Sequence, residues 1–165
     1  SDVTYRLDRG LIDFGILIEP ADISKYDYVR LPSSDKWGVI MKKDCHLAHK
    51  EFIEKTDLIG LPLIMSRQAI DAKEDNNFIR WFGDDFEKLN IIATFNLLFN
   101  AAMLVKSGSG YIVSIDNIIN TGDDSELCFV PLKPELKSGL VLVWKKYQVF
   151  SPAALVFLQT LKNRL

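Results

Sequence analysis

Residues 89–115 read LNIIATFNLLFNAAMLVKSGSGYIVSI, and this stretch decides the fold class. Residues 89–95 are rich in β-branched and aromatic side chains, which favours a strand. Asn96 is a suitable N-cap for an apolar helix that reaches Lys106 and is stopped by Gly108. Residues 111–115 follow at once as a second strand. The order strand, helix, strand predicts a βαβ unit, in which the strands are parallel and the crossover is right-handed.

Strands and helices alternate on both sides of this unit, which predicts an α/β fold. The predicted strands are short segments, apolar or alternating and bounded by turn residues: 12–18, 26–31, 36–41, 61–65, 127–132 and 140–145. Residues 26–31 and 36–41 are read as two strands with a short break at Pro32. An amphipathic helix is predicted over residues 74–82, ending at Gly83. A terminal helix begins at Pro152, with Ser151 as its cap, and runs through Leu161.

The composition indicates a globular chain with a real core. The 165 residues are 48% hydrophobic and 25% charged, with a net charge of −2, enough for one ordinary domain or two small lobes. Two cysteines cannot provide a disulfide framework, and free thiols suit a cytoplasmic location; a single disulfide is the alternative. No apolar stretch reaches the ~20 residues of a membrane span. Acid slightly exceeds base, so this chain by itself is not expected to bind nucleic acid.

Catalytic and metal-binding patterns are scarce. His46 and His49 lie near Cys45 in a charged segment, but no fourth ligand stands at a recognised zinc spacing, so a surface loop is predicted and no metal. The sequence 108–110 (GSG) follows a helix and precedes a strand, the reverse of a dinucleotide-binding turn. Acid pairs such as 84–85 are read as solvated turns. We therefore predict no enzyme activity, no catalytic residue and no cofactor.

Ligand-binding candidates stand where predicted strands end, because ligands of open α/β sheets bind outside the carboxyl ends of the strands. Ser66, Arg67 and Gln68 follow the strand at 61–65 and offer a hydroxyl, a guanidinium and an amide. A guanidinium can hold a carboxylate through two parallel hydrogen bonds. The alternative for this segment is an ordinary solvated loop.

Two further strand ends complete the candidate site. Phe95 and Asn96 end one strand and open a helix, whose free N–H groups favour an anion, with Phe95 as an apolar wall; an ordinary N-cap is the alternative. Glu19 and Pro20 end the first strand, where Glu19 could accept hydrogen bonds from a ligand. A plain hinge turn is the alternative there.

Several blocks in order then resemble the effector-binding domain of LysR-type transcriptional regulators. The blocks are 7–16 (LDRGLIDFGI), 37–41, 44–48 (DCHLA), 57–64 (DLIGLPLI), 104–112 (LVKSGSGYI), 129–132 (FVPL), 141–146 (VLVWKK) and 152–154 (PAA). The segment 57–64 matches the family pattern closely. The chain departs from that pattern by lacking a proline in 44–48 and another near Ile115.

The resemblance implies a two-lobed fold like that of type II periplasmic binding proteins, with mixed sheets, flanking helices and an interlobe cleft. Lobe I would comprise residues 1–36 and, with the C-terminal helix, 121–165; lobe II would comprise residues 37–120. The family's opening βαβ segment, which precedes the block at 7–16, is not in this chain, so the N-terminal part of lobe I is expected to be missing. The helix-turn-helix domain is absent too, and the chain is interpreted as a fragment of a regulator.

The function expected from the resemblance is to sense a small, anionic metabolite in the interlobe cleft and so control DNA binding or transcription by the full-length protein. The expected partners are the effector, DNA through the absent domain only, and a second copy of the domain, with tetramers in the full-length protein and no membrane. A solute-binding protein of a transport system with the same fold is the alternative. An enzyme on this lobed fold ranks last, because no convergent acid and base residues are found.

Overall fold

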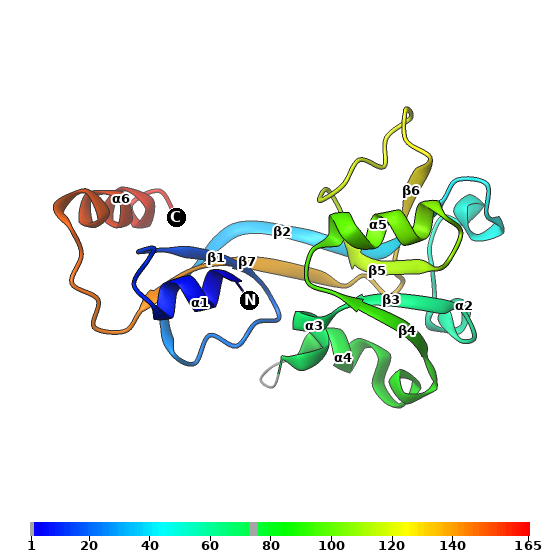
Figure 1. Cartoon of the computed structure of the whole chain (residues 1–165), viewed down its shortest axis with the longest axis horizontal. Helices are drawn as coiled ribbons and strands as arrows, with labels where there is room; N and C mark the ends of the chain where they lie inside the picture. Colours follow the sequence, from blue (N-terminus) through cyan, green and yellow to red (C-terminus); the bar gives the residue numbers. More distant parts are fainter. Residues whose placement is uncertain (1, 73–75) are drawn as a thin grey trace.

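The computed structural model describes residues 2–72 and 76–165 and shows an elongated α/β molecule. Two lobes are joined by a long antiparallel pair of strands, β2 and β7 (Figure 1). The seven strands form one mixed sheet in the order β1-β7-β2-β5-β3-β4, with β6 also paired to β2. The expected α/β class with mixed strands and flanking helices is confirmed.

Lobe I is a small layered structure around three strands. β1 (Gly15–Ile18) pairs antiparallel with β7 (Lys137–Lys145), which pairs with β2 on its other side, so β1 is the edge strand. Helix α1 (Asp2–Asp8) covers one face of this sheet, where Leu7 packs with residues of β1 and β7. Helix α6 (Pro152–Lys162) covers the opposite face, and the predicted cap is confirmed because Ser151 Oγ accepts a hydrogen bond from Ala154 N.

Strand β2 (Tyr26–Lys42) is one continuous strand that passes from lobe I into lobe II. The prediction of two strands here is wrong, because β7 pairs with residues on both sides of the break and holds them in line. Pro32 lies inside a register shift between Arg30 and Ser34. A proline is tolerated at such an irregularity, where its missing N–H removes no ladder hydrogen bond.

The lobe II half of β2 lies between β5 and β6. β5 (Tyr111–Ile115) and β6 (Leu127–Pro131) both pair antiparallel with it. β3 (Pro62–Ser66) pairs in parallel with β5 and with β4 (Asn90–Phe95). The predicted βαβ unit is therefore present as β4-α5-β5, but its strands flank β3 rather than each other. The predicted lobe boundaries stay a prediction. β6, which lies in the segment 121–165 assigned to lobe I, pairs with Gly38–Lys42 of β2.

Short helices cover both faces of the lobe II sheet. They are η1 (His46–His49), α2 (Lys55–Leu58), α3 (Arg67–Asp71), α4 (Asn77–Phe82), η2 (Gly83–Lys88) and α5 (Leu98–Lys106). α4 ends at the predicted Gly83 and is capped by Asn76 Oδ1, which accepts from Ile79 N at 3.0 Å. The predicted start of this helix, at residues 74–75, lies outside the described residues.

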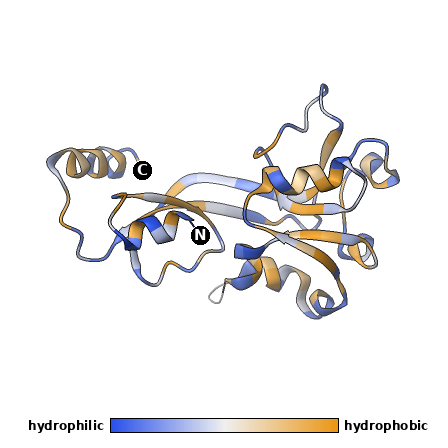
Figure 2. Cartoon of the chain, in the orientation of Figure 1, coloured by the Kyte–Doolittle hydropathy of each residue, from blue (hydrophilic) through white to orange (hydrophobic). Residues whose placement is uncertain are grey.

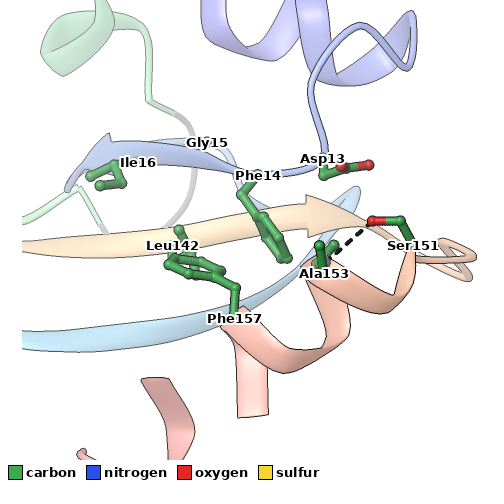
Figure 3. A pocket seen from close by; sticks show the side chains of 9 residues that line it. Asp13, Phe14, Gly15, Ile16, Leu142, Ser151, Ala153 and Phe157 are labelled. Atoms are coloured by element: carbon green, nitrogen blue, oxygen red, sulfur yellow. Dashed lines mark hydrogen bonds between the residues drawn. The ribbon is translucent and has the colours of Figure 1, made fainter. Parts of the chain in front are cut away.

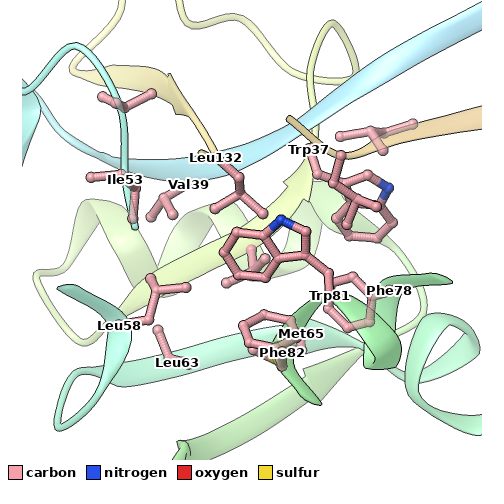
Figure 4. Close-up of a cluster of buried hydrophobic side chains, with 14 of the residues drawn as sticks. Trp37, Val39, Ile53, Leu58, Leu63, Met65, Phe78, Trp81, Phe82 and Leu132 are labelled. Atoms are coloured by element: carbon pink, nitrogen blue, oxygen red, sulfur yellow. The ribbon is translucent and has the colours of Figure 1, made fainter. Parts of the chain in front are cut away.

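The main core lies in lobe II, on the face that α3 and α4 cover (Figure 4). Trp37 and Val39 of β2 meet Phe78, Trp81 and Phe82 of α4 there. The rings of Trp37 and Phe78 are tilted against each other and lie 4.4 Å apart between centroids, at the short limit for packed aromatic pairs. On the other face, α5 buries its apolar side against β2, β3 and β5.

Figure 2 shows apolar residues gathered in these core elements and polar residues in the connecting loops. Among the described residues, the helices are too short or too polar to cross a bilayer.

Candidate functional site

The carboxyl ends of β3 and β4 meet at one edge of the lobe II sheet. Ser66, the last residue of β3, stands in parallel register with Phe95, the last residue of β4. Two of the predicted strand ends are therefore direct neighbours. Ser66 Oγ accepts a hydrogen bond from Ala69 N at 3.3 Å and so caps α3. The solvated loop that was the alternative for this segment is not observed, since the cap and the burial of Ala69 against the main core stabilise a short helix.

Arg67 is exposed at this edge and is held by the neighbouring strand. Its Nε and Nη2 atoms lie 3.3 Å and 3.2 Å from Thr94 Oγ1, to which both donate. In the part of the chain that the structure describes, none of the ion pairs involves Arg67. The guanidinium therefore keeps an uncompensated positive charge, and its Nη1 group can still donate.

Gln68 connects this edge to lobe I. Its Nε2 atom donates to the backbone oxygen of Ile18 across 3.1 Å, in a partly buried position. Ile18 ends β1 and immediately precedes Glu19, so the first predicted strand end faces the other two across the lobe boundary. We name Ile18, Glu19, Ser66, Arg67, Gln68, Thr94 and Phe95 the interlobe site.

Glu19 is the acidic member of the interlobe site and has a protein partner already. Its Oε1 atom lies 3.2 Å from Arg30 Nε, and the hydrogen bond to this carboxylate raises the pKa of Arg30 above its ordinary value. The backbone N–H of Glu19 donates to Gly139 O at 2.9 Å. A Cβ atom at Gly139 of β7 would lie 2.6 Å from Glu19 Oε2. The absence of a side chain at Gly139 therefore leaves room for the Glu19 carboxylate. Pro20 is buried beside it.

Asn96 does not have the role that the sequence suggested. Helix α5 begins at Leu98, and the residue before it, Leu97, makes no side-chain cap. The prediction of Asn96 as the N-cap is wrong, because the start of α5 is set by burial of Leu98, Ala101 and Val105 against the sheet. Asn96 is exposed next to the half-buried Phe95.

Sequence reasoning missed Thr94 and Ile18. Thr94 precedes Phe95 in a strand whose side chains alternate between exposed and half-buried positions, so its exposed hydroxyl could have been anticipated from that alternation. The contribution of Ile18 is a backbone oxygen, which no side-chain pattern reveals.

The hinge behind the interlobe site carries a buried hydrogen bond. Trp37 Nε1 donates to Ser138 Oγ, and both residues are at most 3% exposed. Asn77 Nδ2 of α4 donates to Lys137 O at 3.3 Å. These bonds tie lobe II to β7 where the strand enters lobe I.

Two hollows lie elsewhere. The larger, about 480 Å³, is lined by Phe14, Ile16, Leu142 and Phe157, between the edge strand β1 and helix α6 (Figure 3). The smaller, about 250 Å³, lies around Phe52. Neither is lined by a predicted site residue. Among the described residues, no three His, Cys, Asp or Glu side chains are grouped so that they could hold a metal ion.

The family model described as the LysR substrate binding domain matches residues 1–165. No curated protein matches the chain in sequence. Among solved structures, HinK, a LysR family transcriptional regulator from Pseudomonas aeruginosa, is similar with a TM-score of 0.72 at 17% identity. The match covers 99% of this chain and 57% of HinK, so the chain spans little more than half of that regulator.

Two shorter structures are also similar. The regulatory domain of CcmR from Synechocystis PCC6803, solved in complex with 2-PG, has a TM-score of 0.71 at 18% identity and covers 97% of this chain and 76% of that one. The C-terminal domain of a probable LysR family regulator from Rhodococcus sp. RHA1 has a TM-score of 0.72 at 16% identity, with 98% and 79% covered. At such identities these likenesses show the fold.

Proposed function

The chain belongs to the LysR substrate-binding domain family, and we propose that it binds a small anionic metabolite at the interlobe site. In the full-length regulator, this binding would control DNA binding or transcription. The family and fold are those of effector-binding domains of transcriptional regulators. The anionic character of the ligand, the formation of a homodimer and the link to DNA are parts of this proposal.

The observation that carries the proposal is the unpaired charge of Arg67. The guanidinium is fixed in place by Thr94 and has no carboxylate among the ion pairs of the described residues. An anion bound there would receive charge-assisted hydrogen bonds, which are about twice as strong as neutral ones. Ser66 and Gln68 stand on either side of Arg67 in the chain and add polar groups.

Binding between lobes also offers a way to regulate. A ligand shifts a conformational equilibrium only through its different affinity for the two states. Gln68 already joins α3 to β1 across the lobe boundary through Ile18 O. An anion that contacts Arg67 on one lobe and groups near Glu19 on the other would therefore favour one relative position of the lobes.

The experiment is a thermal-shift screen of the chain against small carboxylates, amino acids, aromatic acids and 2-PG, the molecule bound to the Synechocystis domain. A ligand at about a hundredfold its Kd adds ~2.7 kcal/mol of stability. For any ligand found, we expect Arg67→Ala to weaken binding by roughly 2–4 kcal/mol, the range for a close charge pair.

Arg164→Ala is the matched control, because Arg164 is exposed near the C-terminus and outside the interlobe site. It should leave ligand binding unchanged. An anionic ligand that binds the Arg67→Ala variant as tightly as the original chain would refute the interlobe assignment.

A further inference from the structure

The chain has two cysteines, far apart in the sequence, and the fold brings them to the same end of lobe II. Cys128 of β6 stands opposite Met41 of β2 in the antiparallel register. The pairing continues past the end of β2, where Lys43 N donates to Glu126 O at 2.9 Å. The chain then turns back, with Cys45 N donating to Lys42 O at 3.2 Å. This turn places Cys45 beside the strand pair that carries Cys128.

The two thiols also share one face of the sheet. Cys45 and Cys128 are both partly buried and both pack against the main core, which includes Met41. Tyr111 packs against the same core from β5, on the other side of β2. Cys45, Tyr111 and Cys128 therefore pack against the core on the same face of the sheet as Met41.

Electrostatic interactions agree with this placement. Burial raises the pKa of the Cys128 thiol above its ordinary value, and the neighbouring Cys45 raises it further, while Lys43 opposes the shift. Burial likewise raises the pKa of Tyr111, and its hydroxyl interacts with the Cys45 thiol. Each of these two groups thus has Cys45 as a neighbour.

We propose that Cys45 and Cys128 are a redox-active thiol pair, which a hydroperoxide converts into an intramolecular disulfide. This modification site is separate from the interlobe site. Tyr111 begins β5 and pairs with Leu63 near the start of β3, whereas Ser66 ends β3. The thiols therefore lie at the opposite end of the parallel strands from Arg67.

The chemistry needs two steps and no metal. The Cys45 thiolate attacks one oxygen of the hydroperoxide, so that an S–O bond forms, the O–O bond breaks, and a sulfenic acid and an alcohol, or water from hydrogen peroxide, result. The Cys128 thiolate then attacks the Cys45 sulfur, so that the S–S bond forms, the S–O bond breaks and water leaves with the thiol's proton. The two thiols lose two electrons and the peroxide gains them.

The roles follow from the surroundings of each sulfur. Cys128 keeps its proton to higher pH, which suits the second, resolving position. The Tyr111 hydroxyl beside Cys45 can donate a hydrogen bond to a thiolate or sulfenate there. Disulfide formation should therefore become faster as the pH rises, because the thiolate is the attacking species.

The test is to treat the dilute, reduced chain with hydrogen peroxide and to map its peptides by mass spectrometry without reduction. We expect one cross-linked peptide pair containing Cys45 and Cys128, lighter by two hydrogens, and its loss on treatment with dithiothreitol. The oxidised chain should melt at a higher temperature than the reduced chain, since a cross-link between distant residues restricts the unfolded chain.

The single variants Cys45→Ser and Cys128→Ser provide the controls, and neither should form the internal cross-link. The main measurement uses the chain without substitutions, so it does not depend on how the two variants fold. The proposal is overturned if both thiols stay titratable in excess peroxide, if either is oxidised without a link between them, or if the disulfides join two chains.

Discussion

The two lobes of this molecule contain similar elements but differ in how completely their sheets are covered. In lobe II the clusters on the two faces hold 17 and 8 buried residues among those described, whereas the two clusters of lobe I hold 5 and 3. Lobe I also exposes apolar side chains around the edge strand β1, including Ile16 at 55% and Phe157 at 49%. Helices α1 and α6 therefore cover the faces of the lobe I sheet but leave its edge open.

This difference matters because the stability of a sheet depends on the apolar area that its faces remove from water. Among the described strands, β1 pairs with β7 alone, and its other edge can pair with another chain. Lobe II should therefore contribute most of the free energy of folding. Strands β2 and β7, which run through both lobes, connect lobe I to this more stable part.

The largest expected effect is Phe78→Ala in the main core. Phe78 is completely buried, and removing such a ring costs about 3–5 kcal/mol. The matched change in lobe I is Phe157→Ala, which should cost about 1 kcal/mol because half of the ring is already exposed. Urea unfolding curves of both variants measure these values, and equal losses would remove the distinction between the lobes.

A smaller effect is expected from glycines that face a close neighbour. An alanine Cβ at Gly38 of β2 would lie 2.5 Å from the backbone oxygen of Val130, which cannot move without disturbing β6. We expect Gly38→Ala to cost about 1–3 kcal/mol. The three atoms nearest an alanine Cβ at Gly15 in lobe I all belong to side chains of α1, Val3 and Leu7, which are easier to displace than a backbone oxygen. Thermal unfolding should show a smaller loss of stability for Gly15→Ala than for Gly38→Ala. The reverse order would contradict the view that lobe I is packed less tightly than lobe II.

Trp37→Phe tests the hinge between the lobes. The substitution keeps most of the buried ring and removes the bond from Nε1 to Ser138 Oγ, at an expected cost of about 1–2 kcal/mol. Once Trp37 has been changed, Ser138→Ala should cost much less than it does in the original chain. Additive losses in this double-mutant cycle would show that the hydrogen bond does not couple the two residues.

The smallest effect concerns the alkaline stability of lobe I. Burial, followed by the hydrogen bond to Asp8, raises the pKa of Tyr26 from 10.0 to about 12. Below pH 10 Tyr26 is neutral in both states. Between pH 10 and 12 the unfolded chain ionises first, so this contribution to stability is lost as the pH rises.

Tyr26→Phe should therefore flatten the fall in stability over this pH range and cost about 1 kcal/mol at neutral pH, the usual value of one hydrogen bond. Urea unfolding at several pH values checks this result. Tyr147→Phe is the control, since Tyr147 is 97% exposed, and a change of slope in the control rather than in Tyr26→Phe would contradict the prediction.

Local sequence signals predicted the elements well where they agreed with packing. The Ser151 cap and the stop at Gly83 are confirmed because a capping hydroxyl and a left-handed glycine act within a few residues. The same kind of signal was wrong at Asn96, where burial of Leu98 and Val105 determines the start of α5. A side-chain cap contributes about 1 kcal/mol, less than the burial of two large apolar residues.

By itself, the sequence determined the α/β class, most strand positions and the strand ends that supply Ser66, Arg67 and Phe95, because hydrophobic periodicity and turn residues act over short distances. Only the tertiary structure decided that β2 is one strand through two lobes, that Gln68 reaches Ile18, and that Cys45 lies beside Cys128. Those relations join residues distant in the chain, and they depend on strand register and packing, which no local pattern contains.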